Sequence, residues 1–558
     1  MAKLISADLT NNKLCIIKYT TTNRKILGFF PNSFDAKILS NTYHINGEII
    51  FEKPITKLCG LLSISNKDLT SILIPDSVES IDDRVFVGCT NLENFRGKFS
   101  SVDGRCLIQN GKLVSFARVG ITDYTIPNSV TSIGNRAFSN CTNLISINIP
   151  NSVISIGEES FYGCTSLTNI SISNNVTDIM RGALEGCKKL TNILIPNSVI
   201  SIGERAFSHC EGLEEIVIGK NVKTIGDNAF YYCERIKSIT IPDSVIAIGA
   251  EAFKYCFSLI SITLSNSLTT IGKSAFRACG ITSITIPNSV MDIEECAFES
   301  CFKLSEFKGK FSSQDGRCLI IDGVLNSFAP AKLHKYTIPN DVSTIGYRAF
   351  SKCPIHNITI GNNVTTIGNS AFNECKELET VTIHNGVKTI GAESFYICKK
   401  LRDITIPTSV TSIGDKAFVC CESLENVVIP NSITTIGNES FMACERIANI
   451  IIGDGVTTIG NAAFCCCKSL TNVVIPSNVT TIGKQAFRGC RNLANITIGE
   501  GAVDIGWTAF MECNIKTIIC CSRIPPRINN SFGEFENLIV PTGCEEAYAN
   551  SDWGKYLE

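Results

Sequence analysis

The stretch "LTNILIPNSVISIGERAFSHC", Leu190 to Cys210, decides the fold, because versions of it return along most of the chain. Ile193 and Ile195 stand two residues apart, and this period of two predicts a short strand with one face on a core. Pro196 ends that strand because it lacks the amide proton that a sheet ladder uses. The β-branched run that begins at Val199 predicts a second, shorter strand on another side of the coil.

The segment after Gly203, "ERAFSHC", closes the coil. It is too short for a stable helix, so we expect a turn or a single round of 3₁₀ helix that inserts Ala206 and Phe207 into the core. The sequence therefore predicts a chain rich in short strands and turns, with little α-helix.

The repeat is found by following the aromatic residue of the Ala-Phe pair. Its spacing is 23 residues, apart from two intervals of 22 and two of 52. A fixed period in the twenties is the signature of a solenoid, in which stacking buries a core that no single coil could form. We predict 17 coils, about 80 Å of continuous core at one strand spacing per coil. The anchors are Phe86, Phe138, Phe161, Leu184, Phe207, Phe230, Phe253, Phe276, Phe298, Phe350, Phe372, Phe395, Phe418, Phe441, Phe464, Phe487 and Phe510.

A cysteine stands three residues after every anchor. Equivalent residues of stacked coils lie about 4.8 Å apart with parallel Cβ vectors, which is farther than the roughly 3.8 Å between the Cβ atoms of a disulfide. A zinc ion needs ligands that converge, whereas a ladder offers them in a line, and the five histidines share no repeat position. We predict a ladder of buried, reduced thiols: Cys89, Cys141, Cys164, Cys187, Cys210, Cys233, Cys256, Cys279, Cys301, Cys353, Cys375, Cys398, Cys421, Cys444, Cys467, Cys490 and Cys513.

Composition and motifs exclude several classes of function. The formal net charge is −2 with 18% charged residues, which indicates no nucleic-acid partner. No run reaches the roughly 18 apolar residues of a membrane span, and the start "MAKLISADLTNNK" meets Asp8 too early for a signal peptide. No catalytic constellation stands out from the repeat, so we expect neither an enzyme nor a metal or cofactor site.

The pattern C-x-x-L-x-x-I-x-I-P-x-S-V-x-x-I-G-x-x-A-F-x-x-C resembles the BspA-like class of leucine-rich repeat, which is found in bacterial and some protist surface proteins. The segment Lys18 to Leu58 is similar to the N-terminal cap of such proteins in gut Bacteroidetes, and the segment from Pro525 is similar to their C-terminal cap. We therefore expect an N-terminal cap with a degenerate first coil over residues 1–68, a solenoid over 69–513 and a C-terminal cap over 514–558. The resemblance implies a secreted or cell-surface protein, although such proteins usually carry an export signal and none is visible in this chain.

Two insertions explain the intervals of 52 residues. They follow Phe95 and Phe307, at about 97–125 and 309–337, and each carries two Asx-Gly hairpin signals. We expect three-stranded β excursions at one edge of the solenoid. They are either binding knobs or copies of one duplicated unit, and their near-identical sequences favour duplication.

One face of the first strand carries an unusual pattern in the C-terminal coils. Residues on either side of the inward position point outward. They form a row of asparagines beside a row of mainly β-branched residues: Asn426 and Val428, Asn449 and Ile451, Asn472 and Val474, Asn495 and Thr497. Stacked asparagines can serve a purely structural ladder. An exposed apolar row also marks interaction sites.

We therefore expect a non-catalytic binding or adhesion module that recognises a protein or glycan partner through the solenoid surface. The alternative is a structural or self-associating scaffold, including an intracellular one, which would fit the reduced cysteines.

Overall fold

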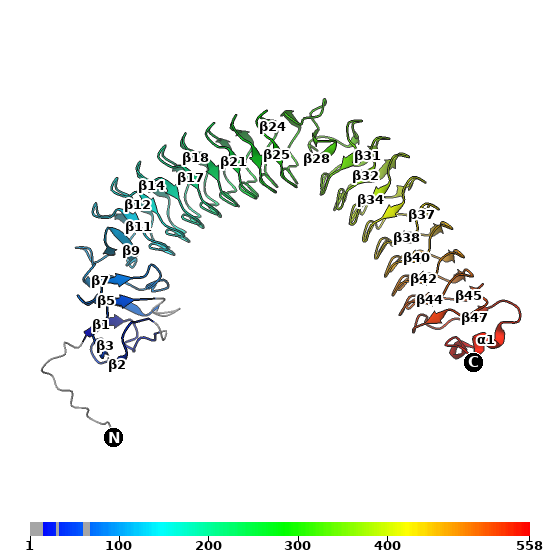
Figure 1. The fold of residues 1–558 in the computed structure, drawn as a ribbon, viewed down its shortest axis with the longest axis horizontal. Helices are drawn as coiled ribbons and strands as arrows, with labels where there is room; N and C mark the ends of the chain where they lie inside the picture. Colours follow the sequence, from blue (N-terminus) through cyan, green and yellow to red (C-terminus); the bar gives the residue numbers. More distant parts are fainter. Residues whose placement is uncertain (1–14, 30–32, 60–66, 558) are drawn as a thin grey trace, which may run out of the picture. The chain divides into compact units, whose positions relative to one another are not determined.

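In the part of the chain that the structure describes, the fold is a β-solenoid of about 21 turns, each of about 23 residues, with almost no helix. The computed structural model describes residues 15–29, 33–59 and 67–557. They divide into two compact units, residues 1–279 with 287–294 and residues 280–286 with 295–558. Figure 1 shows the coils of each unit stacked as layers. The predicted fold class is confirmed, whereas the predicted number of 17 coils is too low.

Each coil has three sides, which the coil from Leu190 illustrates. The first side is the strand β16 (Asn192–Leu194), and the second side is the two-residue strand β17 (Ser201–Ile202). The third side is the turn segment from Gly203 to Cys210, where we expected a turn or a round of 3₁₀ helix; a turn is found. Neighbouring coils pair in parallel and in register, as Ile193 does with Ile216.

In the first unit, the second side forms one long sheet and the first side several short ones. The long sheet contains β8 (Cys106–Gln109), β9 (Lys112–Phe116), β11 (Ser132–Ile133), β13 (Ser155–Ile156), β15 (Asp178–Ile179), β17, β19 (Thr224–Ile225), β21 (Ala247–Ile248), β23 (Thr270–Ile271) and β25 (Asp292–Ile293). The first-side strands are β10 (Asp123–Thr125), β12 (Ser146–Asn148), β14 (Asn169–Ser171), β16, β18 (Glu215–Val217), β20 (Ser238–Thr240) and β22 (Ser261–Thr263).

The second unit repeats this arrangement. Its long sheet contains β27 (Cys318–Ile321), β28 (Val324–Phe328), β30 (Thr344–Ile345), β32 (Thr366–Ile367), β34 (Thr389–Ile390), β36 (Ser412–Ile413), β38 (Thr435–Ile436), β40 (Thr458–Ile459), β42 (Thr481–Ile482), β44 (Asp504–Ile505) and β46 (Arg527–Ile528). The first-side strands are β24 (Ser283–Ile286), β26 (Glu306–Gly309), β29 (Lys335–Thr337), β31 (Asn357–Ile360), β33 (Thr380–Ile383), β35 (Asp403–Ile404), β37 (Asn426–Ile429), β39 (Asn449–Ile452), β41 (Asn472–Ile475), β43 (Asn495–Ile498), β45 (Thr517–Cys520) and β47 (Asn537–Ile539).

The third side also forms a hydrogen-bonded ladder, although its residues are in turns. The amide of Phe207 donates to the carbonyl of Ala229 in the next coil at 2.8 Å, while the amide of Ala206 donates within its own coil to Gly203. Arg205 and His209 supply the left-handed conformations that this alternation requires, with φ of 57° and 58°. Every side of the coil therefore forms backbone hydrogen bonds with its neighbours, as buried amides and carbonyls require.

The core is a column of repeated side chains. The rings of Phe395, Phe418 and Phe441 are buried and lie nearly parallel, with centroids 5.2 and 5.0 Å apart. Aromatic rings left to themselves prefer offset or edge-to-face contacts, so this parallel stack follows from the backbone, which fixes the spacing between coils.

The two insertions do not form excursions at an edge, as we had expected, but enter the stack. In the first, β9 pairs in parallel with β11, and the ring of Phe116 packs 4.7 Å from that of Phe138. In the second, β28 pairs with β30 and Phe328 packs 4.5 Å from Phe350. Each insertion therefore supplies one further coil, whose second-side strand is entered through an antiparallel hairpin.

The two ends of the solenoid are covered. At the N-terminal end, β1 (Cys15–Thr21), β2 (Ile38–Tyr43) and β3 (Gly47–Phe51) form an antiparallel layer that continues into β5 (Leu69–Ile74) and β7 (Asn94–Gly97), beside a short pair of β4 (Lys57–Leu58) and β6 (Ser80–Ile81). The stretch 1–13, which we expect not to be a signal peptide, lies outside the described residues. At the other end, Phe532 extends the ring column and contacts buried Trp553 at 5.2 Å, between α1 (Glu545–Ala549) and η1 (Gly554–Tyr556).

Replacing Phe464 with alanine should destabilise the chain by about 3–5 kcal/mol, because it removes a fully buried ring from the column. Its neighbours Phe441 and Phe487 lie 5.4 and 5.2 Å away and cannot close the gap while the ladders hold. Urea unfolding followed by circular dichroism would measure the loss. Phe257→Ala, at a ring that is 47% exposed, is the control and should cost much less. Equal losses in the two variants would contradict the burial of Phe464 in the ring column.

Candidate functional site

The outward residues of the C-terminal first-side strands form an apolar row, which we call the ridge: Val428, Ile451 and Val474. Each of these side chains is between 51% and 61% exposed. Val428 is paired in register with Ile451 on β37 and β39, and Val474 with Thr497 on β41 and β43. The structure therefore places the predicted residues on one side of the solenoid, pointing to solvent.

The asparagine row beside the ridge consists of two pairs and not of one run of four. The amide of Asn449 donates to the side-chain oxygen of Asn426 at 3.1 Å, and that of Asn495 donates to Asn472 at 2.7 Å. The amide of Asn472 donates instead to the hydroxyl of Thr471, and β39 and β41 belong to separate hydrogen-bonded sheets. Because these amides satisfy one another across coils, the asparagines mainly serve the ladder.

The apolar row continues beyond the residues that the sequence indicated. Ile519 on β45 is paired with Thr497 and with Ile539 on β47, and the two isoleucines are 38% and 51% exposed. Sequence analysis missed them because they lie after Cys513, where the spacing signature of the repeat ends. The alternation in "TIIC" and "NLI" was the available signal.

In the first unit, the exposed aliphatic residues are arranged differently from those of the ridge. On its second side, Ile154, Ile200 and Ile246 are exposed, but Thr177 and Lys223 occupy the intervening coils and separate them. On its first side, among the described residues, only the neighbours Leu194 and Val217 form an exposed apolar pair. The ridge differs in that adjacent coils carry apolar residues in succession.

A strip of aromatic residues lies on the third side of the first unit. His209 stacks on Tyr232 at 5.2 Å, and Tyr232 packs against Tyr255 at 4.6 Å. Lys254 lies 5.2 Å from the Tyr255 ring and pairs with Glu251 at 2.8 Å. Because the ring faces are engaged with one another, the strip offers mainly ring edges to solvent.

The insertions border surface hollows and share a polar network. In the first, Asp103 accepts hydrogen bonds from Ser101 and from the hydroxyl of Tyr124, whose oxygen lies 3.1 Å from the sulfur of Cys106. Burial opposes ionisation of Asp103, but these hydrogen bonds and one from the backbone amide of Arg105 lower its pKa. Ser313, Asp315, Tyr336 and Cys318 repeat the network in the second insertion. The hollows measure about 480 and 570 Å³.

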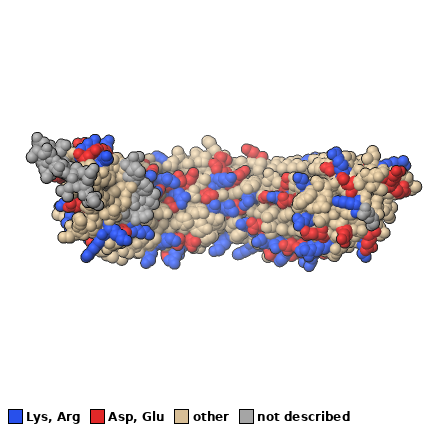
Figure 2. Space-filling model, turned by 90° about the horizontal axis from the view of Figure 1, so that it is seen from below, with Lys and Arg blue, Asp and Glu red and all other residues tan. Residues whose placement is uncertain are grey.

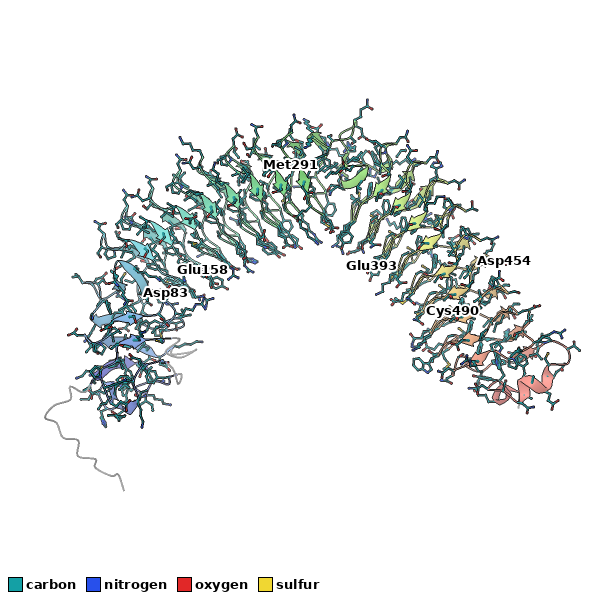
Figure 3. All side chains as sticks on the ribbon, in the orientation of Figure 1. Asp83, Glu158, Met291, Glu393, Asp454 and Cys490 are labelled. Atoms are coloured by element: carbon teal, nitrogen blue, oxygen red, sulfur yellow. The ribbon has the colours of Figure 1, made fainter. Side chains whose placement is uncertain are left out.

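Charged residues pair between coils and make no large single-sign region on the face drawn in Figure 2, where both signs are interspersed. Lys468 lies 2.6 Å from Glu445 and Lys400 pairs with Glu377, in each case 23 residues apart. Glu158 and Glu393, which are labelled in Figure 3, lie in the third-side turns of their coils. Exposed pairs of this kind contribute about 0–1 kcal/mol each, so they tune the surface more than they hold the fold.

All 28 cysteines are free, and the 17 of the ladder are buried. Most ladder thiols donate a hydrogen bond to the carbonyl of the phenylalanine in the preceding coil, as Cys490 (labelled in Figure 3) does to Phe464 at 3.2 Å. Burial raises the pKa of the Cys210 and Cys353 thiols to about 12, so these sulfurs stay protonated and unreactive at neutral pH.

Contrary to the expectation from the sequence, two of the five histidines share a repeat position. His334 and His356 lie six residues after Phe328 and Phe350, whose rings pack together, and the Nδ1 atoms of the two histidines are 3.2 Å apart. We missed this pair because the insertion that contains Phe328 was treated as lying outside the repeat. Within residues 15–29, 33–59 and 67–557, no group of three or more His, Cys, Asp or Glu side chains is placed to hold a metal ion. In the same part of the chain, no helix has the length and hydrophobicity of a membrane span.

The coil geometry and its spacing define a leucine-rich-repeat solenoid. The sequence model described as "BspA type Leucine rich repeat region" matches residues 63–113, 112–237, 223–314, 325–444 and 411–539, and the chain belongs to this family. A search of curated proteins finds no match.

Several solved structures are similar to this chain. A leucine-rich cell surface protein from Faecalibacterium prausnitzii is 30% identical, and the match covers 61% of this chain and 90% of that one with a TM-score of 0.48. A leucine-rich repeat protein from Bacteroides ovatus is 26% identical over 76% of this chain and 94% of that one, with a TM-score of 0.42. A third, from Eubacterium ventriosum, is 19% identical over 66% and 90%, with a TM-score of 0.39.

The ladder thiols should resist alkylation in the native protein, because they are buried and the reagent cannot reach them. Iodoacetamide should modify at most the six partly exposed cysteines, which are Cys59, Cys420, Cys465, Cys466, Cys521 and Cys544. Unfolding in guanidinium without reductant should then make the remaining thiols reactive, so that all 28 cysteines are alkylated in total. Peptide mass spectrometry would count them, and regular disulfides between coils would contradict the arrangement.

Proposed function

We propose that the chain is a non-catalytic binding module that recognises a protein or glycan partner on the first side of its C-terminal coils. One observation carries the proposal. Val428, Ile451 and Val474 occupy the same outward position in three consecutive coils, and all three are exposed, so no charged residue interrupts the row. Exposed apolar rows of this kind mark interaction sites, because covering them removes apolar area from water.

The chemistry of the ridge favours a protein partner over a glycan. Interface centres are apolar and depleted in charge, with a polar rim. Here a branched aliphatic row has the asparagine pairs on one flank, and those amides can add hydrogen bonds at the rim. The base is hydrogen-bonded within the pair β37 and β39 and within the pair β41 and β43, so little ordering entropy is lost when a partner binds. The secreted or cell-surface location implied by the family is part of the proposal.

The second candidate is self-association, favoured by β47. This strand ends the four-stranded sheet of β41, β43, β45 and β47, and Asn537 and Ile539 on it are exposed. The last strand of a sheet can pair through its outer edge with a second chain. Sedimentation velocity from low to high micromolar concentration would separate this candidate from the first, because only self-association makes the sedimentation coefficient rise with concentration.

Substituting lysine at both Ile451 and Val474 should weaken partner binding by at least tenfold, about 1.4 kcal/mol, because a charge would be buried against the partner. Probes would be a solubilised fraction of epithelial surface proteins and a printed glycan array, read against the wild-type chain. The double variant should keep the wild-type urea midpoint, since neither side chain supports the core.

The matched control is Ile200→Lys with Met291→Lys, two exposed apolar residues on the second side of the first unit. Equal binding by the two double variants would remove the ridge as the site. Loss of binding on Val102→Lys or Gln314→Lys would instead place the partner at an insertion. Because the insertions supply whole coils, deleting residues 309–335 would disturb the stack, and point changes are the cleaner test.

A further inference from the structure

His334 and His356 are held side by side by the backbone. Both residues directly precede paired strands, β29 and β31, in which Lys335 is in register with Asn357. The carbonyl of His334 accepts the amides of His356 and Asn357, each at 3.0 Å. The two imidazoles therefore stand one strand spacing apart on a rigid base, with little backbone freedom to separate.

The side chains converge at the distance that a shared ligand requires. Their Nδ1 atoms are 3.2 Å apart, close enough to share a hydrogen bond that an ion would replace, and the rings meet edge-on at 67°. With metal–nitrogen bonds of about 2.0–2.1 Å, two nitrogens on one ion lie about 2.9 Å apart at a right angle and about 3.4 Å apart at a tetrahedral angle. The observed separation falls inside that range. His334 is exposed and His356 half-buried, so an ion from solvent can reach them.

We propose that His334 and His356 form a two-nitrogen site for a divalent late first-row transition ion, a class that includes Ni²⁺, Cu²⁺ and Zn²⁺. Both imidazoles would ligate through Nδ1 with the proton on Nε2. Water would fill the remaining positions, since no third ligand group completes a cluster among the described residues. Imidazole suits these ions, whereas Ca²⁺ and Mg²⁺ prefer oxygen.

The surroundings indicate a site of moderate affinity. Glu379 follows in the next coil, where its amide donates to the carbonyl of His356 at 2.8 Å, so a carboxylate belongs to the neighbouring position of the same row. Lys335 beside His334 adds a positive charge that opposes a cation. The site is independent of the ridge, and its test does not depend on any partner.

Isothermal titration of the full chain with NiCl₂ tests the proposal. Nickel is the probe because copper oxidises thiols, of which this chain has many. Wild type should bind one Ni²⁺ per chain, and His334→Gln or His356→Gln should weaken binding by more than the roughly 10–100-fold that loss of an outer-shell partner costs. Both residues are outside the core, and circular dichroism should show each variant folded.

Control variants assign the ion to this pair. His209→Gln and His384→Gln keep the pair and should bind nickel as wild type does. Cys465→Ser with Cys466→Ser removes two partly exposed sulfurs that lie 3.6 Å apart and should also leave binding unchanged. Absence of nickel binding in wild type, binding that persists in both pair variants, or binding that follows the cysteines would each overturn the proposal.

Discussion

Hydrogen bonds between the backbones of successive coils are the constraint on which the rest of the structure depends. They run on all three sides: through the first-side strands, through the two-residue second-side strands, and through alternate amides of the third-side turns. Three ladders fix neighbouring coils at one strand spacing, about 4.8 Å. The protein therefore needs no helix to close its coils, only two left-handed residues in each turn.

Because of this spacing, each side chain lies next to the side chains at the same repeat position in the neighbouring coils. Each repeat position must therefore hold a residue type that can pack against another residue of the same type. Phenylalanine does so by stacking face to face, and asparagine by pairing its amides. Cysteine does so by donating its thiol hydrogen to a carbonyl of the preceding coil, which leaves sulfur unbonded to sulfur. Charged residues cannot repeat without repulsion, and lysine therefore faces glutamate across coils, as in Lys468 and Glu445.

The same constraint explains what could be predicted from the sequence. The period of 23 and the inward residues gave the fold class and the buried column, because a repeated core leaves a repeated sequence. The insertions were misplaced because Phe116 and Phe328 lack the Ala-Phe-x-x-Cys signature, although each stands 22 residues before the next anchor. The sequence does not tell which of two similar hydrogen-bond partners a side chain takes. Asn449 and Asn472 stand at the same repeat position, yet the amide ladder breaks between them. The outward direction of the ridge followed from strand alternation, and its use as a binding site stays a prediction.

Where the core must repeat, specificity can lie only in outward positions that depart from the repeat. Threonine and lysine separate Ile154, Ile200 and Ile246 on the first unit, which keeps exposed apolar residues apart and limits association. No such residue separates Val428, Ile451 and Val474, although the fold places no packing demand on these outward side chains. Three exposed aliphatic residues in succession expose apolar area that polar substitutions could remove at little structural cost. The free-energy cost of exposing this apolar area to water is removed only when a partner covers it. This is the physical reason to look for the partner there.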